Sequence, residues 1–475
     1  MAEKIKERFF IMLVPLLLTA GGALRAQPLP PVVVSSAAAL PPAVELSTST
    51  LSEIDSSSAP PKYTWSLEDV IGIALNNNPD IQSAQDNLAA ASRVVQETYS
   101  VYLPQVDASG YSTRSTLPVP SAGSTALLGL NRPYTEGMIG VRQTLFDFGR
   151  GLQDIRARRA ESRSAGEELI ALRNVIELST ERAFYDVASS QKLVEVARKS
   201  LAQFEETYRR TNLLVQTGVR PAFDLSQAAV ELSKAQLALI NAKNTRDLAK
   251  VALLNIMGME RVETFALKES ASQAPSLRVR TLSMERLTDK ALQARPEMRR
   301  YQFEREAAIA RLRLQRRDYL PTLGASGWYG RFLPDYPTAL RSAWSYGLGV
   351  SWNLFDGLAT TFRIKELEAR LDQEEALAKR QSQSIVAEVA TAFMNLLRAE
   401  QNETVADEGL VFAKENFHYA QLRYDADIGT ILELLVAETS LVNADAVQVQ
   451  ARYRYATSLS ALQTAVNAPL IEGQK

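Results

Sequence analysis

The chain has no cysteine and only one histidine, His418. Without cysteine it has no disulfide, thiol nucleophile or cysteine-based zinc site, and we expect no lipid on an N-terminal cysteine. Neither sign of charge dominates, because Lys and Arg total 53 against 54 for Asp and Glu. A nucleic-acid partner is therefore not expected, since it would require a clustered basic excess.

Long hydrophobic runs are scarce as well. The run Phe9–Leu18 follows a basic start and precedes small residues up to Ala26. It is shorter than the ~20 residues that a membrane-spanning helix needs. Residues 1–26 are therefore predicted to be a secretory signal peptide, with a single membrane anchor as the alternative. Residues 27–62, rich in proline and serine, are predicted to be a disordered segment.

Catalytic motifs are not found either. His418 lies between aromatic residues, and no cluster of metal-binding residue types accompanies it. Asp147-Phe148-Gly149 imitates a kinase motif, but the glycine-rich loop, the paired lysine and the His-Arg-Asp element are missing. No glycine loop with lysine offers a phosphate site. We expect no enzymatic activity and no resident cofactor or metal.

What the chain does contain is a long internal duplication. A set of residues in the first half recurs in the second half at a nearly constant offset. The matching pairs include Ser66 with Ser283, Pro79 with Pro296, Tyr102-Leu103-Pro104 with Tyr319-Leu320-Pro321, and Leu145-Phe146-Asp147 with Leu354-Phe355-Asp356. A repeat of this length indicates two copies of one large unit rather than a short solenoid array. We place the copies at 63–280 and 281–469.

Each copy contains a long stretch of good helix formers. Leu152–Thr217 and Leu358–Ile428 contain no proline and one glycine each. A helix of ~70 residues would be about 100 Å long. Each copy also begins with shorter helices, one after Ser66 or Ser283 and one from Pro79 or Pro296. Ser66 is a predicted N-cap without a full capping box, because neither copy has Glu or Gln three positions later.

A second helix follows each long one, with alanine or a larger apolar residue at alternating steps of three and four. In the first copy these residues are Leu225, Ala228, Leu232, Ala235, Leu239, Ala242, Ala249 and Leu253. In the second copy they are Leu434, Ala437, Leu441, Ala444, Ala451, Tyr455, Ser458 and Leu462, with Gln448 as an interruption. This heptad seam favours either a coiled coil or an ordinary antiparallel hairpin within a bundle.

Two β-hairpins are predicted between the helices, at 105–147 and 322–356. The clearest strand alternates six apolar residues with small or polar ones: Trp344, Tyr346, Leu348, Val350, Trp352 and Leu354. This pattern favours a lipid-facing strand with aromatic ends, and a soluble hairpin packed on helices is the alternative. Four strands are too few to close a membrane barrel, and lipid does not tolerate open sheet edges. Several chains would therefore have to share one barrel.

Each long helix ends at a short break in the helical pattern, and the two breaks are predicted to form the tips. They contain Thr217, Gly218, Val219 and Arg220 in one copy and Ile428, Gly429 and Thr430 in the other. Asp427 stands where the first copy has Gly218, and aspartate visits left-handed backbone at modest cost. Asp224 and Glu433 are positioned to cap the returning helices. The functional alternative is that charged residues close an aperture; these are Arg209, Arg220, Arg423, Asp425, Asp427, Glu433 and Asp224.

This duplicated order of elements resembles the TolC-type outer membrane efflux proteins over residues 64–468. The resemblance implies a mainly α fold with a small β portion, in which a homotrimer forms a twelve-stranded outer-membrane β-barrel continuous with a long periplasmic α-barrel. It implies an outer membrane channel, the passive exit duct of a tripartite efflux or type I secretion system. A periplasmic adaptor would dock at the tips and, with an inner-membrane pump or ABC exporter, open them. The docking residues are expected to be Thr217, Gly218, Val219, Arg220, Ile428, Gly429 and Thr430. The alternative from the residues alone is a soluble periplasmic coiled-coil scaffold.

Overall fold

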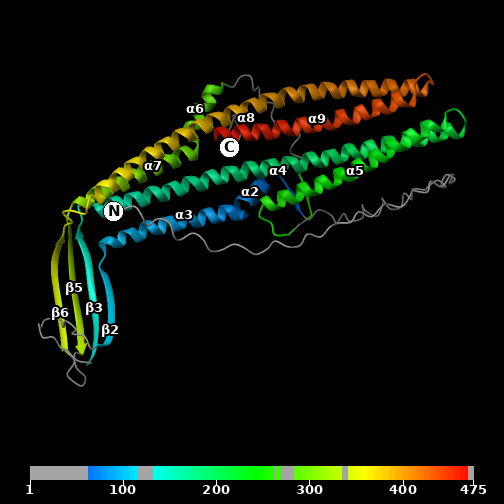
Figure 1. Ribbon diagram of the computed structural model, residues 1–475. Coiled ribbons are helices and arrows are strands. Elements are labelled where there is room, and N and C mark those ends of the chain that lie inside the picture. The colour runs from blue at the N-terminus through cyan, green and yellow to red at the C-terminus, as the bar shows by residue number, and fades with distance from the viewer. Residues whose placement is uncertain (1–62, 116–131, 262–263, 269–282, 334–340, 469–475) are drawn as a thin grey trace, which may run out of the picture. The chain divides into compact units, whose positions relative to one another are not determined.

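Two copies of one element order make up the protein (Figure 1). The computed structural model describes residues 63–115, 132–261, 264–268, 283–333 and 341–468, all within one structural unit that begins at Pro60. The predicted signal peptide and the segment 27–62 lie outside these residues. The proposed copy boundaries at 63–280 and 281–469 stay predictions.

The first copy contains α2 (Leu67–Asn77), α3 (Pro79–Thr98), the 3-10 turn η1 (Tyr99–Tyr102), β2 (Gln105–Ser115), β3 (Arg132–Phe146), α4 (Arg150–Gln216) and α5 (Ala222–Ile256). The second contains α6 (Met284–Ala294), α7 (Pro296–Arg316), η4 (Arg317–Tyr319), β5 (Thr322–Leu333), β6 (Arg341–Ser351), α8 (Ala359–Asp425) and α9 (Ile431–Val466). The short strands β1 (Tyr63–Trp65) and β4 (Phe265–Leu267) form a separate parallel pair. The predicted fold class, a mainly α chain with a small β portion and a duplicated unit, is confirmed.

The two long helices have the predicted length. α4 and α8 contain 67 residues each, which corresponds to about 100 Å at 1.5 Å per residue. α5 returns along α4 and α9 returns along α8, so each copy ends in an antiparallel hairpin (Figure 1). The predicted seam residues Ala228, Ala235 and Leu253 are buried in α5. Gln448, the interruption in α9, donates a hydrogen bond to Asp407 of α8 at 2.9 Å.

The helix starts correct one prediction. Ser66 accepts a hydrogen bond from the backbone N–H of Asp69, and the Asp69 carboxylate accepts one from the backbone N–H of Ser66. The capping box is therefore complete in the first copy, because aspartate at the third position replaces the usual Glu. In the second copy, Ser283 makes no side-chain cap bond. Pro79 and Pro296 begin α3 and α7 as predicted.

The strands form one antiparallel sheet in the order β2-β3-β5-β6. Both hairpins exist, and β3 pairs with β5 to join the two copies. β2 and β6 are the edge strands. β6 ends at Ser351, so Trp352 and Leu354 lie beyond the strand and the predicted six-residue lipid-facing set is reduced to four within it. None of the helices in the described ranges is both long and apolar enough to cross a membrane.

Each copy contributes its own hydrophobic core. In the first copy, buried residues of α2, α4 and α5 pack together around Val70, Phe184 and Leu253. In the second, residues of α6, α8 and α9 pack around Ala291, Leu396 and Leu462. A third buried cluster lies nearer the helix tips and brings α4, α5, α8 and α9 together. This cluster joins the helical hairpin α4–α5 of the first copy to the helical hairpin α8–α9 of the second. The other two cores each lie within one copy.

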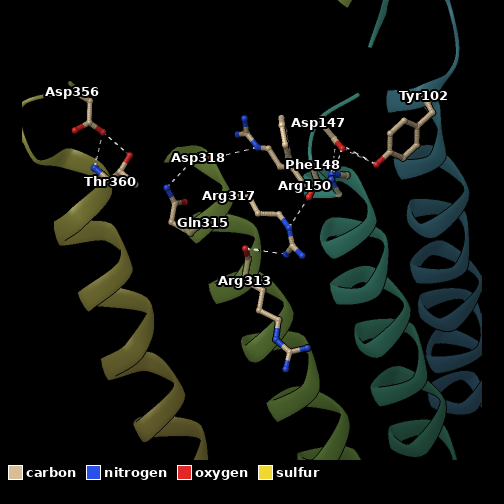
Figure 2. Close-up of polar contacts among 12 residues, drawn as sticks. Tyr102, Asp147, Phe148, Arg150, Arg313, Gln315, Arg317, Asp318, Asp356 and Thr360 are labelled. Carbon is tan, nitrogen blue, oxygen red and sulfur yellow. Dashed lines mark hydrogen bonds and ion pairs between the residues drawn. The ribbon is translucent and has the colours of Figure 1, made fainter. Parts of the chain in front are cut away.

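A tight turn connects each β-hairpin to the long helix that follows it (Figure 2). In the first copy, Phe148 and Gly149 both adopt left-handed backbone, with φ of 53° and 77°. The buried Asp147 carboxylate accepts hydrogen bonds from the backbone N–H of Gly149 at 2.9 Å and of Gly151 at 2.6 Å, and from the Tyr102 hydroxyl at 3.2 Å. The Asp147 carboxylate therefore caps the start of α4 from two positions before the N-cap residue, Gly149.

The second copy uses different partners at the same place. Gly357 and Leu358 are its left-handed residues, and Asp356 accepts bonds from the backbone N–H and the hydroxyl of Thr360 at 2.8 and 2.5 Å. Side chains of one copy also reach the other in this region (Figure 2). Arg317 donates to the carbonyl of Phe148 at 2.9 Å, and Arg150 pairs with Asp318 at 3.1 Å. These contacts hold the first copy's turn against η4, where α7 of the second copy leads into β5.

Candidate functional site at the helical tips

The turns between the long and returning helices have the same backbone shape in both copies. Gly218 and Asp427 occupy equivalent positions with φ of 76° and 62°. In each turn, the two residues that follow donate their N–H groups to one carbonyl, that of Leu214 in the first copy and of Arg423 in the second. Asp427 therefore adopts the left-handed conformation that glycine adopts in the first copy, and the turn is preserved.

Arg220 connects the two tips. Its guanidinium lies 2.7 Å from a carboxylate oxygen of Asp427, and it donates to the carbonyl of Gly429 at 3.4 Å. The guanidinium also stacks over the ring of Tyr424, with its carbon 4.8 Å from the ring centre. The Arg220 side chain is 15% exposed, whereas that of Asp427 is 72% exposed. A planar guanidinium suits this combined stacking and ion pairing.

A second ion pair lies beside the first. Arg210 of α4 lies 3.0 Å from Asp425 at the end of α8. Close by, the hydroxyls of Thr211 and Tyr424 are 3.5 Å apart, and both residues are buried. We call Arg210–Asp425 and Arg220–Asp427 the tip ion pairs. Each takes its cation from the first copy and its carboxylate from the second.

The second tip also has an internal ion pair. Arg423 lies 3.4 Å from Glu433 and donates to the carbonyl of Ile428 at 3.3 Å. The predicted cap of α9 is wrong in detail, because the hydroxyl of Thr430 accepts the bond from the backbone N–H of Glu433. Glu433 instead lies in the first turn, where a negative charge is favourable.

The remaining candidates of the first tip divide into two groups. Asp224 lies buried in the first turn of α5, whose N-cap position is Pro221. Arg209 pairs with Glu206 one turn earlier on the same helix and does not reach the second hairpin. Its neighbour Arg210 makes that contact, although the sequence did not single it out. One position changes the direction of a helical side chain by about 100°, which decides between the two arginines.

Apolar side chains stand exposed around these charges. Val219 and Phe223 are exposed at the first tip, and Ile428 and Leu432 at the second. Gly429 is buried against Arg423 and is not itself accessible. Among the described residues, no group of three or more acidic or histidine side chains forms a metal site. The site therefore offers salt bridges between the helical hairpins and an exposed apolar rim.

A model of the family described as outer membrane efflux protein matches residues 70–259 and 287–468, one match in each copy. The chain belongs to this family. It is 22% identical over 400 residues to the probable efflux pump outer membrane protein TtgC of Pseudomonas putida, covering 82% of this chain and 81% of the relative. It is 22% identical over 403 residues to the outer membrane protein TolC of Escherichia coli, covering 80% and 77%.

Solved structures agree with the fold. The outer-membrane channel OprN has a TM-score of 0.71 at 18% identity, with 85% of this chain and 90% of that chain covered. The Campylobacter jejuni CmeC outer membrane channel has a TM-score of 0.71 at 18% identity, with 86% and 87% covered.

Membership in this family makes the chain an outer membrane efflux channel with a periplasmic helical extension. The alternative of a soluble periplasmic scaffold is thereby set aside, and the expectation that the protein is not an enzyme is confirmed. Outer membrane factors of this type are trimeric and work with an adaptor and a pump.

Proposed function

We propose that three copies of this chain join their sheets edge to edge into one twelve-stranded barrel in the outer membrane. The observation that carries the proposal is the four-stranded sheet with the unpaired outer edges of β2 and β6. In hydrocarbon, unpaired backbone groups cost several kcal/mol each, and pairing β6 of one copy with β2 of the next removes that cost. The exposed Trp344, Tyr346, Leu348 and Val350 of β6 face lipid in this arrangement.

The helices form the periplasmic conduit below this barrel. A helix of about 100 Å has no use in a small globular core, and it spans much of a periplasmic compartment. The conduit is passive, because the described residues hold no metal cluster and the sequence carries no nucleotide-binding loop. Free energy for transport comes from the partner pump, either an inner-membrane pump or an ABC exporter.

The tips close this conduit at rest. The tip ion pairs hold the second hairpin against the first, and Arg423–Glu433 stiffens the second tip. Opening moves α8–α9 away from α4–α5 and breaks the tip ion pairs. A periplasmic adaptor docks on the exposed rim, with Thr217, Gly218, Val219, Ile428 and Thr430 as the contact residues. Its binding supplies the free energy of opening, since a ligand shifts a conformational equilibrium only by its difference in affinity for the two states.

Membrane fractionation with gel electrophoresis of unheated and heated samples tests the assembly. The proposal expects the protein in the outer membrane fraction, as a species of three chains that heating converts to one. A single chain in the soluble periplasmic fraction, before and after heating, would refute it. Conductance of the purified trimer in a planar bilayer then tests whether the assembly is a channel.

A further inference from the structure

Glu438 of α9 is a buried carboxyl group with too few partners. It lies about two turns beyond the start of α9, and its side chain is fully buried. One oxygen, Oε2, accepts a hydrogen bond from the hydroxyl of Thr207 on α4 at 3.2 Å. The other oxygen, Oε1, has no hydrogen-bond partner among the described residues. An ionised carboxylate in this position would be a desolvated charge with the Thr207 hydroxyl as its one hydrogen-bond donor among the described residues, which is costly.

The surroundings of Glu438 do not compensate a negative charge. Leu434 and Leu435, one turn earlier on α9, belong to the buried apolar cluster that joins the two hairpins. α4 adds Phe204 to that cluster, one turn before Thr207, and α8 adds Tyr424 and the partly buried Phe417.

The charged side chains of the packed helices are engaged elsewhere. Glu231 of α5 is close enough for its charge to act on Glu438, and it pairs with Lys234 at 2.7 Å. Arg210 of α4, which contacts the second hairpin, is paired with Asp425 of α8. No cation from the described parts of these helices pairs with Glu438.

These surroundings favour the protonated form. Burial raises the pKa of Glu438 from 4.5 to about 7; the hydrogen bond from Thr207 opposes the rise and the charge of Glu231 adds to it. The folded-state pKa lies above the unfolded value, so protonated Glu438 stabilises the packed hairpins fully below pH 4.5. That stabilisation is lost as the pH rises toward about 7.

We propose that Glu438 is a proton-controlled contact between the two hairpins. With its proton it lets α9 pack without water against α4 and α5 and favours closed tips. Without its proton the carboxylate is charged and is stabilised by hydration. Water reaches it only when α9 moves away from α4, so deprotonation favours the open state. The inference rests on the proposed function, because it assigns a consequence to the same movement of α8–α9 that breaks the tip ion pairs.

Open probability of the full-length trimer in a planar bilayer, measured across neutral pH, tests this directly. The wild-type protein should open roughly tenfold more often at about pH 8 than at about pH 6. The pKa of Glu438 is lower in the open state than in the closed state, and each unit of that difference corresponds to a factor of ten in the equilibrium between them. Glu438→Gln, which imitates the protonated group, should remain at the low value throughout. Glu181→Gln is the matched control, since burial also raises the pKa of Glu181, which lies on α4, the helix of Thr207, but away from the tips. It should keep the wild-type profile.

Two further variants move the midpoint in opposite directions. Thr207→Val removes the bond that stabilises the carboxylate and should shift the midpoint to higher pH. Glu231→Gln removes a repelling charge and should shift it to lower pH. A wild-type trimer that conducts with no pH dependence, or a Glu438→Gln variant that keeps the wild-type dependence, overturns this inference and leaves the channel assignment intact. A trimer that never conducts, even when the tip ion pairs are removed, overturns the proposed function and this inference with it.

Discussion

A guanidinium nitrogen of Arg220 lies 2.7 Å from a carboxylate oxygen of Asp427, although the two residues belong to different copies of the duplicated unit. The pair joins the two hairpin tips, and the Tyr424 ring covers one face of the guanidinium. Its geometry is that of a partly buried ion pair, because Arg220 is largely enclosed while Asp427 faces solvent. A contact of this kind is worth about 1 kcal/mol after solvent screening, or roughly a fivefold change in an equilibrium.

Arg220→Ala should therefore open the tips. The variant loses the ion pair and the stacking on Tyr424, so the closed state loses roughly 1 kcal/mol or somewhat more. The expected result is a severalfold rise in single-channel open probability without loss of the trimer. Arg209→Ala is the control, because within the described ranges Arg209 pairs with Glu206 of its own helix and not with the second hairpin. Equal conductance of the two variants would contradict a role for Arg220 in closure.

The carboxylates of the second tip provide a separate prediction. Replacing Asp427 and Glu433 together with alanine removes the partners of Arg220 and Arg423, and it should widen the resting pore. Asp427→Asn separates charge from backbone shape, because asparagine also accepts left-handed backbone. It should raise the conductance nearly as much as Asp427→Ala. Unchanged conductance of the double variant would count against an aperture at these residues.

Asp147 is predicted to stabilise the turn between β3 and α4. Asp147→Ala removes two bonds to backbone N–H groups and one from Tyr102, in a place where Phe148 and Gly149 are both left-handed. The loss should be about 2–4 kcal/mol, since buried donors are left without acceptors. A lower temperature of trimer dissociation on gels measures it.

Asp356→Ala is the matched variant in the second copy. Asp356 accepts bonds from a single residue, Thr360, so a smaller drop in the dissociation temperature is expected. If Asp356→Ala costs as much as Asp147→Ala, the number of hydrogen bonds at the turn does not set the stability.

Arginine substitutions on the two faces of β6 test which face contacts lipid. Leu348→Arg places a cation on the exposed apolar face and should cost about 2–4 kcal/mol near the bilayer centre. Ser345→Arg lies on the opposite face, because successive side chains of a strand alternate, and should be tolerated. The amount of trimer in the outer membrane fraction compares the two. Better recovery of Leu348→Arg would reverse the assignment of faces.

Much of the fold was predictable because its signals are local. The absence of proline between Leu152 and Thr217 predicted the length of α4, and the alternation from Trp344 to Val350 predicted β6. The end of β6 was misjudged, since Trp352 and Leu354 continue the alternation after backbone pairing has stopped. Asp69 was overlooked as a capping residue because the usual pattern has a longer acidic side chain.

The tip site was only partly predictable, because it depends on packing between copies. The sequence identified Asp427 and Arg220 through their turn, yet nothing local pairs them across the two hairpins. Glu438 follows Ala437 of the α9 seam and would point to solvent in a two-helix hairpin. α9 also packs against α4, which encloses it. A periodicity of one helix cannot reveal a second packing partner.

In the proposed assembly separate chains complete one barrel, so the mass of the detergent-solubilised particle shows how many chains it contains. Native mass spectrometry of the protein purified from the outer membrane should give three times the mass of one chain. A particle of one chain, stable and folded in detergent, would contradict the shared barrel and the channel built on it.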